Sequence, residues 1–346
     1  MLILGIESSC DETAAAILED GANIRSSVVA SQASTHHAFG GVVPELASRE
    51  HVGNIAVVVQ MALQQAGFGF SDLEGVAVTR GPGLMGSLLV GLSYAKGLAY
   101  RLQIPFLGVN HLEGHLLSIF LDHPNAELPA LSLVVSGGHT NLYLLTEKLN
   151  YRLLARTRDD AAGEALDKLS KMLGLGYPGG PLIEQLAGHG DSQAVGFTMP
   201  KISDGSLDFS FSGLKSAARR LLEKDPSPSL DPTQLENAPS RIAALAASYQ
   251  KAVVDQLLLR SRQALKQQDV RSFHLSGGVS CNSYLRDRAT AELGLLGLPV
   301  YFPRPALTTD NAAMIAAAGY ARLRAGHLDG WDLQADPGLR ILESAL

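Results

Sequence analysis

The chain has 346 residues, more than one typical domain, and its 46% hydrophobic and 18% charged residues are ordinary for a globular protein. A net charge of −6 weighs against an autonomous nucleic-acid binder, because phosphate contacts need lysine and arginine. The two cysteines, Cys10 and Cys281, are too few for a disulfide framework. We find neither a run of about 18 uncharged apolar residues nor a signal-peptide pattern, so we expect a cytoplasmic protein with no membrane partner.

Any contact with nucleic acid must therefore use a local basic patch. Two loose clusters of basic residues occur, and each is also explained more simply as the solvated face of a helix. The clusters are Arg152, Arg156, Arg158, Lys168 and Lys171, and Lys215, Arg219, Arg220 and Lys224.

The first predicted elements are two apolar runs around a polar turn. Residues 2–6 form a buried strand, residues 7–13 the turn, and residues 14–18 a second strand. Apolar spacing then predicts helices over 44–66 and 84–102, with strands over 75–78 and 104–109. The opening plan recurs as a strand over 131–135, a turn over 136–140 and a strand over 141–145. This recurrence predicts a duplicated α/β chain.

The remaining elements complete the second copy. Helical patterns cover 241–266, 281–292 and 311–325, and strands cover 272–275 and 300–302, whereas the proline-rich segment 224–240 is expected to be a surface loop. We place the first domain at 1–125, closed by 311–346, and the second at 126–310.

The sequence HLEGH follows the predicted strand 104–109 and sets His111 and His115 four residues apart. On a helix that spacing puts both imidazoles on one face, where they can grip a metal ion. Two surface histidines at a helix start are the alternative. The motif differs from the HExxH of zinc proteases, because Glu113 lies off the shared face and a protease would lack its general base.

A third ligand must come from elsewhere in the chain. Asp310 sits at the start of the last predicted helix, and two histidines with one aspartate suit iron(II) or zinc(II). Taken alone, Asp310 would be interpreted as the N-cap of that helix.

Three small or glycine-rich turns follow strands, at 8–13, 136–140 and 276–282. Backbone N–H groups in such turns can hold a phosphate. Together they resemble the two-domain architecture of actin-like ATPases and sugar kinases, in which the nucleotide lies between the domains. A helix followed by a glycine-rich loop covers 159–181, and Asp167 and Gly180 would face a ligand if the loop closed.

Ten ordered motifs, spread almost end to end, make the chain similar to the TsaD family, whose archaeal and eukaryotic relatives belong to the KEOPS complex. They are GIESSCDET, GGVVPELASREH, TRGPGLMGSLLVG, GVNHLEGH, VSGGHT, DDAAGEALDK, GYPGGP, FSFSGLKS, SGGVSCN and TDNAAMIA. The loop 224–240 is longer than the family pattern, and Cys281 replaces a smaller residue; neither departure touches a proposed ligand.

The resemblance implies two duplicated α/β domains of the actin-like ATPase and sugar-kinase type, RNase H-like, with an interdomain nucleotide cleft. It also implies transfer of a threonylcarbamoyl group from threonylcarbamoyl-AMP to N6 of the adenosine just 3′ of the anticodon. The substrates would be tRNAs that read codons beginning with A, and AMP would be released.

The same resemblance assigns the site. One Fe²⁺, with Zn²⁺ as the alternative, would be held by His111, His115 and Asp310. ATP or threonylcarbamoyl-AMP, with Mg²⁺ as an additional ion, would bind a second set of residues. That set is Val135, Ser136, Gly137, Gly138, His139, Asp167, Gly180 and Asn282. His139 with Thr140 follows the bacterial form of its turn, which implies a TsaB-type partner at the first domain, a TsaE-type ATPase, and a TsaC-type synthase that supplies the adenylate.

Asp11 and Glu12 are the candidates to accept the proton of the amine, and either could instead order its turn. Two other functions stay open from the residues. One is a metallo-endopeptidase, and the other is an actin-type ATPase module that uses magnesium on phosphate and needs no histidine pair.

Overall fold

The computed structural model describes residues 1–200, 202–226, 228 and 230–341, so two positions of the predicted loop 224–240 lie outside the described residues. The chain folds into two compact units. Unit 1 comprises 1–126, 147–150 and 301–346, and unit 2 comprises 127–146 and 151–300. None of the described helices combines the length and the apolar character needed to cross a membrane.

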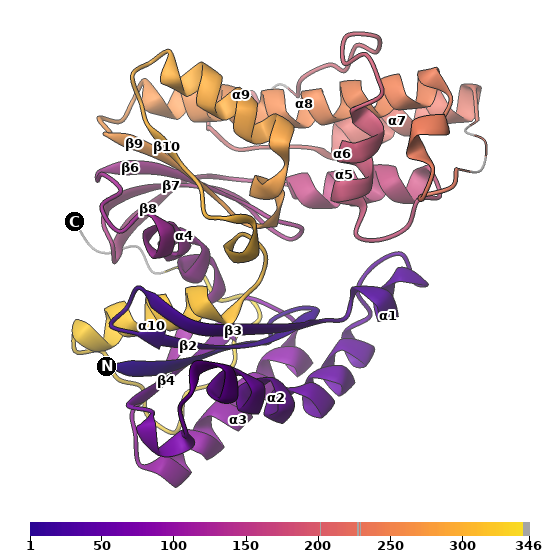
Figure 1. Ribbon diagram of the computed structural model, residues 1–346. Helices are drawn as coiled ribbons and strands as arrows, with labels where there is room; N and C mark the ends of the chain where they lie inside the picture. Colours follow the sequence, from indigo (N-terminus) through magenta and orange to yellow (C-terminus); the bar gives the residue numbers. More distant parts are fainter. Residues whose placement is uncertain (201, 227, 229, 342–346) are drawn as a thin grey trace. The chain divides into compact units, whose positions relative to one another are not determined.

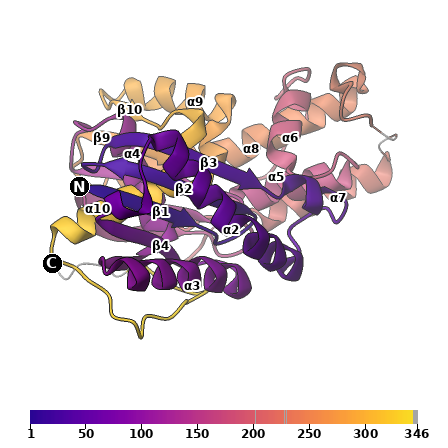
Figure 2. The same cartoon turned by 60° about the horizontal axis from the view of Figure 1, so that its bottom comes forward.

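Unit 1 is a five-stranded sheet covered by helices on both faces (Figures 1 and 2). The strand order is β3-β2-β1-β4-β5, in which the β1–β2 and β2–β3 pairs are antiparallel and the β1–β4 and β4–β5 pairs are parallel. Its strands are β1 (Leu2–Glu7), β2 (Glu12–Glu19), β3 (Asn23–Ser31), β4 (Gly75–Gly81) and β5 (Phe106–Asn110). Its helices are α1 (Ala33–His37), α2 (Pro44–Ala66), η1 (Phe70–Asp72), α3 (Met85–Leu102), α4 (His111–Asp122), η4 (Pro305–Leu307) and α10 (Ala312–Arg324).

Unit 2 repeats the same plan. Its order β8-β7-β6-β9-β10 matches β3-β2-β1-β4-β5 strand for strand, with an antiparallel β6–β7 pair and a parallel β6–β9 pair. Its strands are β6 (Ala130–Val135), β7 (Thr140–Glu147), β8 (Asn150–Arg156), β9 (Ser272–Ser276) and β10 (Val300–Tyr301). Its helices are α5 (Ala162–Met172), α6 (Gly179–Ala187), α7 (Ser212–Lys224), η2 (Leu235–Asn237), α8 (Ser240–Leu265), η3 (Gly278–Cys281) and α9 (Ser283–Gly294). The predicted duplication of an α/β fold is confirmed.

Small residues let α10 approach the sheet of unit 1 closely. A Cβ at Gly5 of β1 would lie 2.1 Å from the carbonyl oxygen of Ala312, and one at Gly319 would lie 2.2 Å from the Cβ of Ala77. The opposite face of the sheet packs its apolar core against α2 and α3. The close packing of α10 on β1 therefore fixes the position of the residues just before the helix, including Asp310, relative to the sheet.

Residues 301–310 lie in unit 1, whereas the sequence placed them in the second domain. The cause is hydrogen bonding to the end of α4: the Arg304 amide donates to Asp122 (2.7 Å), and His123 contacts the Phe302 carbonyl (3.1 Å). Asp310 thus belongs to the same unit as the histidines of HLEGH.

Candidate metal centre

Helix α4 begins directly at His111 because Asn110 ends β5 and caps the helix. The Asn110 side chain accepts a hydrogen bond from the Leu112 amide at 2.9 Å. His111 and His115 then lie one turn apart, their ring centroids 4.8 Å apart, and both are buried. The local sequence therefore sets two imidazoles side by side at the carboxyl end of a parallel strand.

Asp310 joins them from the other end of the chain. Its Oδ1 lies 3.4 Å from Nε2 of His111 and 3.3 Å from Nε2 of His115. One ligand atom from each residue lies within 4.8 Å of the other two. Asn311, and not Asp310, caps α10, since its side chain accepts from the Met314 amide at 3.0 Å. The N-cap interpretation of Asp310 is therefore wrong, and its carboxylate is directed at the histidines.

Glu7, which the sequence analysis did not single out, orients His111. The Glu7 carboxylate is fully buried at the end of β1 and lies 2.9 Å from Nδ1 of His111, while the hydroxyl of Thr79 donates to it at 2.6 Å. Ser9 Oγ also lies 3.2 Å from the same ring nitrogen. A carboxylate that contacts one histidine nitrogen fixes the orientation of the ring and leaves the other nitrogen to bind a metal, as is usual at such sites.

The residues present fit a cation. Burial opposes ionisation of Asp310 and Glu7, but the neighbouring histidines lower the pKa of both carboxyl groups, so two anions are buried together. Burial also opposes charge on His111, yet Asp310 and Glu7 raise its pKa well above the ordinary value. Neither ring nitrogen of the buried His115 makes a hydrogen bond within the described part of the chain. Two imidazole nitrogens and a carboxylate suit iron or zinc.

Glu113 cannot serve as the base of a protease. Its buried carboxylate accepts two hydrogen bonds from Nε of Arg322 on α10, both at 2.9 Å, and lies 2.7 Å from a terminal nitrogen of that guanidinium. The carboxylate is thus held on the side of α4 that packs against α10. This contact removes the chemistry on which the endopeptidase alternative depends.

Asp11 lies on the turn between β1 and β2, and Glu12 is the first residue of β2. The Asp11 carbonyl accepts from the Gln32 amide at 3.0 Å, and the Ser31 hydroxyl donates to the Glu12 carboxyl at 3.3 Å. Burial, with Asp310 and Asp11 nearby, raises the pKa of Glu12 to about 10. A carboxyl group with that pKa carries its proton at neutral pH, so Glu12 is a poor proton acceptor.

His51 holds this turn from α2, a role that the sequence analysis missed. One ring nitrogen lies 2.9 Å from the Cys10 carbonyl and the other 2.7 Å from the Thr13 hydroxyl. Burial lowers the pKa of His51. The neutral ring therefore bridges both ends of the segment that carries Asp11 and Glu12.

The glycine turn after β6 has open backbone at its tip. The Ser136 amide donates to the His139 carbonyl (2.8 Å), and the His139 amide donates to Ser136 Oγ (3.1 Å). A Cβ at Gly137 or Gly138 would meet nothing within 4 Å. Below the turn, Gly277 has φ +87° and lies so close to Val135 that a Cβ would fall 2.4 Å from its carbonyl oxygen. The turn is fixed at its base and uncovered at its tip.

Asp167 and Asn282, which are predicted to bind the nucleotide in unit 2, form hydrogen bonds with other protein groups. Asp167 on α5 accepts from the Gly179 amide at 2.7 Å, immediately before Gly180 at the start of α6. Asn282 caps α9 by accepting from Leu285 and donates to Gln250 at 2.9 Å. The side-chain oxygen and nitrogen of Asn282 thus have protein partners, and its contribution is to position the start of α9.

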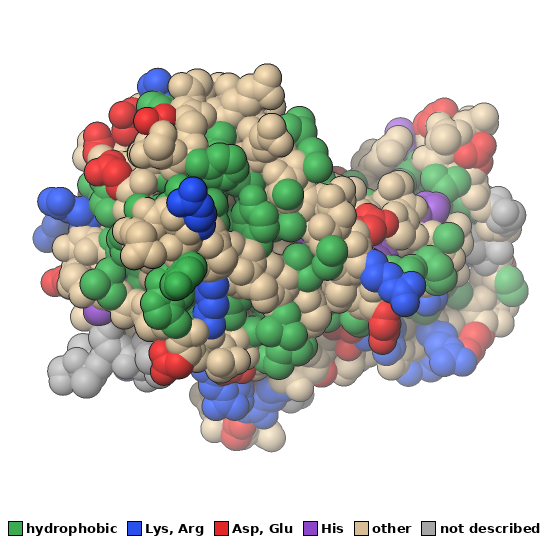
Figure 3. Space-filling view, turned by 90° about the horizontal axis from the view of Figure 1, so that it is seen from below, with side chains coloured by type: hydrophobic (Ala, Val, Ile, Leu, Met, Phe, Trp, Pro, Cys, Tyr) green, Lys and Arg blue, Asp and Glu red, His purple; other side chains and the backbone are tan. Residues whose placement is uncertain are grey.

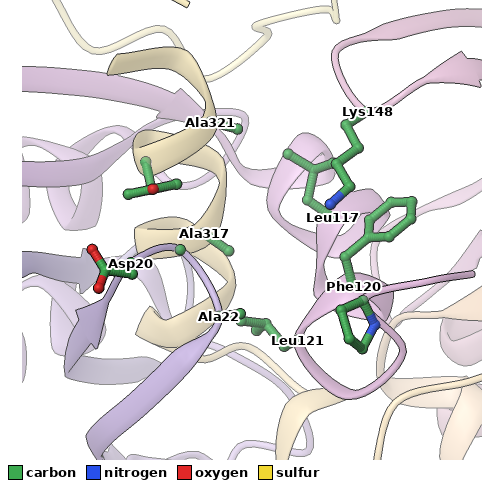
Figure 4. A pocket seen from close by; sticks show the side chains of 11 residues that line it. Asp20, Ala22, Leu117, Phe120, Leu121, Lys148, Ala317 and Ala321 are labelled. Atoms are coloured by element: carbon green, nitrogen blue, oxygen red, sulfur yellow. The ribbon is translucent and has the colours of Figure 1, made fainter. Parts of the chain in front are cut away.

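A separate pocket of about 240 Å³ opens beside the later turns of α4 (Figure 4). Apolar side chains of α4 and α10 line most of it, and Lys148 Nζ lies 4.7 Å from the ring centroid of Phe120 at its edge. The three residues of the metal group are not among those that line it.

The duplicated fold defines the class of protein. Component A of the (R)-2-hydroxyglutaryl-CoA dehydratase of Acidaminococcus fermentans matches with a TM-score of 0.55 at 16% identity, covering 94% of this chain and 99% of its own. Full-length HypF in its phosphate- and nucleotide-bound form matches with a TM-score of 0.58 at 14% identity, covering 93% of this chain and 55% of its own. At such identities the likeness shows the fold alone, that of actin-like ATPases and sugar kinases.

Sequence comparison specifies the family. The TsaD model, described as tRNA N6-adenosine threonylcarbamoyltransferase, matches residues 23–317. A protein of that name from Desulfitobacterium hafniense is 48% identical over 98% of this chain and 97% of its own. Another, from Moorella thermoacetica, is 50% identical over 98% and 97%. The chain belongs to the TsaD family.

Proposed function

We propose that this chain transfers the threonylcarbamoyl group of threonylcarbamoyl-AMP to N6 of the adenosine just 3′ of the anticodon, in tRNAs that read codons beginning with A. The observation that carries the proposal is the buried group of His111, His115 and Asp310, backed by Glu7, in a member of the TsaD family. The reaction forms a bond between N6 and the carbamoyl carbon and breaks the bond from that carbon to the phosphate oxygen, and AMP leaves with the electron pair.

His111, His115 and Asp310 would hold one Fe²⁺, with Zn²⁺ as the alternative, because their donor set and the buried carboxylates suit such a cation. When bound, the ion supplies Lewis-acid polarisation of the transferred group. Glu7 keeps the His111 ring in the orientation that presents Nε2 to Asp310.

The proton of the attacking amine goes to Asp11 in this scheme. His51 and Gln32 hold the turn on which Asp11 lies, so the carboxylate is placed without a change of backbone conformation. Glu12, which is protonated at neutral pH, can donate a hydrogen bond to the substrate.

Unit 2 would hold the adenylate, or ATP with Mg²⁺. The uncovered backbone at Gly137 and Gly138 can bring N–H groups close to a phosphate, since no side chain covers it. The segments that carry Val135 to His139, Asp167, Gly180 and Asn282 are fixed by the hydrogen bonds described above.

A TsaB-type partner would bind unit 1 over α2 and α3. Large apolar side chains are exposed there, and Figure 3 looks onto this part of the molecule, where hydrophobic side chains lie between basic ones. They are Val52, Val57, Met61, Met85, Leu89 and Tyr100. A TsaE-type ATPase and a TsaC-type synthase would complete the system, in the cytoplasm, where tRNA is modified.

Transfer of labelled threonine to unmodified tRNA tests the proposal. The purified chain is combined with its TsaB-, TsaE- and TsaC-type partners, ATP and bicarbonate, and compared with the His111→Ala variant. Label on tRNA from the wild type alone supports both the reaction and the role of the ligand group. No label from the wild type, with partners shown to work beside another TsaD, would favour the ATPase alternative.

A further inference from the structure

The two units differ sharply in charge. The segments of unit 2 contain 18 lysine and arginine residues against 17 aspartate and glutamate, whereas unit 1 contains 10 against 17. Unit 1 therefore carries a net charge of −7 and unit 2 one of +1, which together give the −6 of the chain. A polyanionic substrate meets far less repulsion at unit 2.

Helix α7 concentrates the positive charge of unit 2. Its sequence SGLKSAARRLLEK has four basic residues and the single acid Glu223. Its residues Leu214 and Ala218 are buried, while its residues Arg219, Arg220 and Lys224 are exposed. The basic residues therefore form an outward surface, which we call the α7 basic face: Lys215, Arg219, Arg220 and Lys224.

Acidic neighbours do not neutralise the α7 basic face. Glu223 pairs with Arg219 at 2.8 Å, but within the described ranges no ion pair is formed by Arg220 or Lys224. These two residues lie four positions apart, hence about 6 Å along the helix on the same side. Two adjacent cations are thus left to meet an anion from outside.

The first turn of α7 is held less strongly by acidic groups than α5 is. Asp160 lies 4.0 Å from Lys215, whereas Lys168 of α5 pairs with both Asp160 at 2.6 Å and Glu164 at 2.8 Å. The contact of Lys215 with Asp160 is therefore the weaker of these ion pairs.

Asp159 fixes where α7 begins. Its carboxylate accepts from the Phe211 amide at 2.7 Å and from the Ser212 hydroxyl at 2.9 Å. The α7 basic face is therefore presented from an anchored helix, which lowers the entropic cost of binding a rigid partner.

We propose that the α7 basic face binds the phosphate backbone of the tRNA substrate. This inference rests on the proposed function, which requires a negatively charged chain to bind a polyanion. Backbone phosphates match adjacent unpaired cations on a helix, and such contacts position a nucleic acid without reading its sequence. The occupant is therefore RNA, and an acidic protein is the alternative outcome of the test.

The test compares the Arg220→Gln, Lys224→Gln double variant with a matched control, Lys266→Gln, Arg271→Gln. Lys266 and Arg271 are also exposed in unit 2, so both variants remove the same charge from the same unit. Each is assembled with the partner proteins, and tRNA affinity is measured against salt beside the kcat and KM of transfer. We expect the double variant alone to raise the KM for tRNA by about an order of magnitude with little change in kcat. Its slope of log affinity against log salt should fall by about 1.4 to 1.8.

An unchanged salt slope and KM in the double variant, with wild-type transfer intact, would overturn the proposal and leave the proposed function standing. Equal losses in the control variant would also overturn it, because the effect would then be one of total charge. Unchanged tRNA affinity with weaker assembly of the partners would assign the face to an acidic protein instead. Absence of transfer by the wild type would count against the proposed function, and the binding data would still decide the role of the face.

Discussion

The carboxylate of Glu7 lies 2.9 Å from Nδ1 of His111, although 104 positions separate the two residues. Strand β1 supplies the acid and helix α4 the imidazole, and the parallel sheet brings the strand ends together. Because this contact fixes which ring nitrogen faces Asp310, it sets the orientation of His111 as a metal ligand.

Glu7→Gln keeps the shape of that side chain but removes its charge. We expect metal affinity to fall by about 10- to 100-fold, as is usual when a carboxylate behind a ligating histidine is lost. Competition with a chelator measures it, with Glu19→Gln as a control at a far less buried carboxylate. Equal metal affinity in Glu7→Gln and the wild type would contradict the role of Glu7 in orienting His111.

We expect Asp310→Ala to lose metal binding and Asn311→Ala to lose stability. Asn311 caps α10 and also donates to the carbonyls of Leu307 and Thr309, so its loss should cost about 1 to 2 kcal/mol of unfolding free energy. Asp310→Ala should abolish metal binding without that loss of the cap. Urea unfolding of the metal-free proteins, beside metal content, separates the two; a larger loss of stability in Asp310→Ala would mean that it, too, supports the helix.

Asp11→Asn should reduce transfer much more than Glu12→Gln. The pKa of Glu12, raised to about 10, makes its carboxyl neutral at pH 7, and glutamine preserves a neutral group of the same shape. Asp11→Asn removes the proposed acceptor. Single-turnover transfer with saturating adenylate measures the step, and nucleotide binding is the control. A larger loss in Glu12→Gln would reverse the assignment.

Gly277→Ala should destabilise unit 2 far more than Gly205→Ala. Both glycines have positive φ, +87° and +77°, so each substitution carries a backbone cost of about 1 kcal/mol. Only at Gly277 does the added Cβ also collide with the Val135 backbone, at 2.4 Å, whereas Gly205 faces open space. Equal melting temperatures for the two variants would show that the β6 turn can move away.

Asp159 should stabilise α7 in a pH-dependent way. Burial opposes its ionisation, but hydrogen bonds from Ser210, Phe211 and Ser212 lower its pKa below the ordinary value. A depressed folded-state pKa gives stability that is present above the unfolded value of about 3.9 and is lost as pH falls through the folded value. Hydrogen exchange of α7 should therefore show a protection advantage of the wild type over Asp159→Asn at pH 6 that shrinks below about pH 4. A constant difference between the two would exclude the charge as its cause.

Local spacing was enough to predict much of this protein. The four-residue spacing of His111 and His115 predicted one helix face, and the repeated strand-turn-strand plan predicted the duplication. Strand β3 was missed, because at the edge of its sheet exposed polar residues interrupt its apolar ones. Strand β8, at the edge of the other sheet, was missed as well.

The contacts that orient the site residues could not be predicted from local spacing. Glu7 and His51 act through partners fixed by strand register and helix packing, which no local pattern reports. Asp310 looked like a helix cap until the next residue, Asn311, was found in that role. The residue types alone made Asp310 a candidate third ligand, and the resemblance to a family assigned it to the histidines.

The most direct test measures bound metal and threonylcarbamoyl transfer on the same preparations of wild type, His111→Ala and His327→Ala. His327 is exposed and outside the ligand group, so its variant controls for loss of an imidazole. We predict about one ion per chain and full transfer in the wild type and His327→Ala, with both lost in His111→Ala. Transfer by His111→Ala at the wild-type rate, or a full ion content in it, would contradict the account.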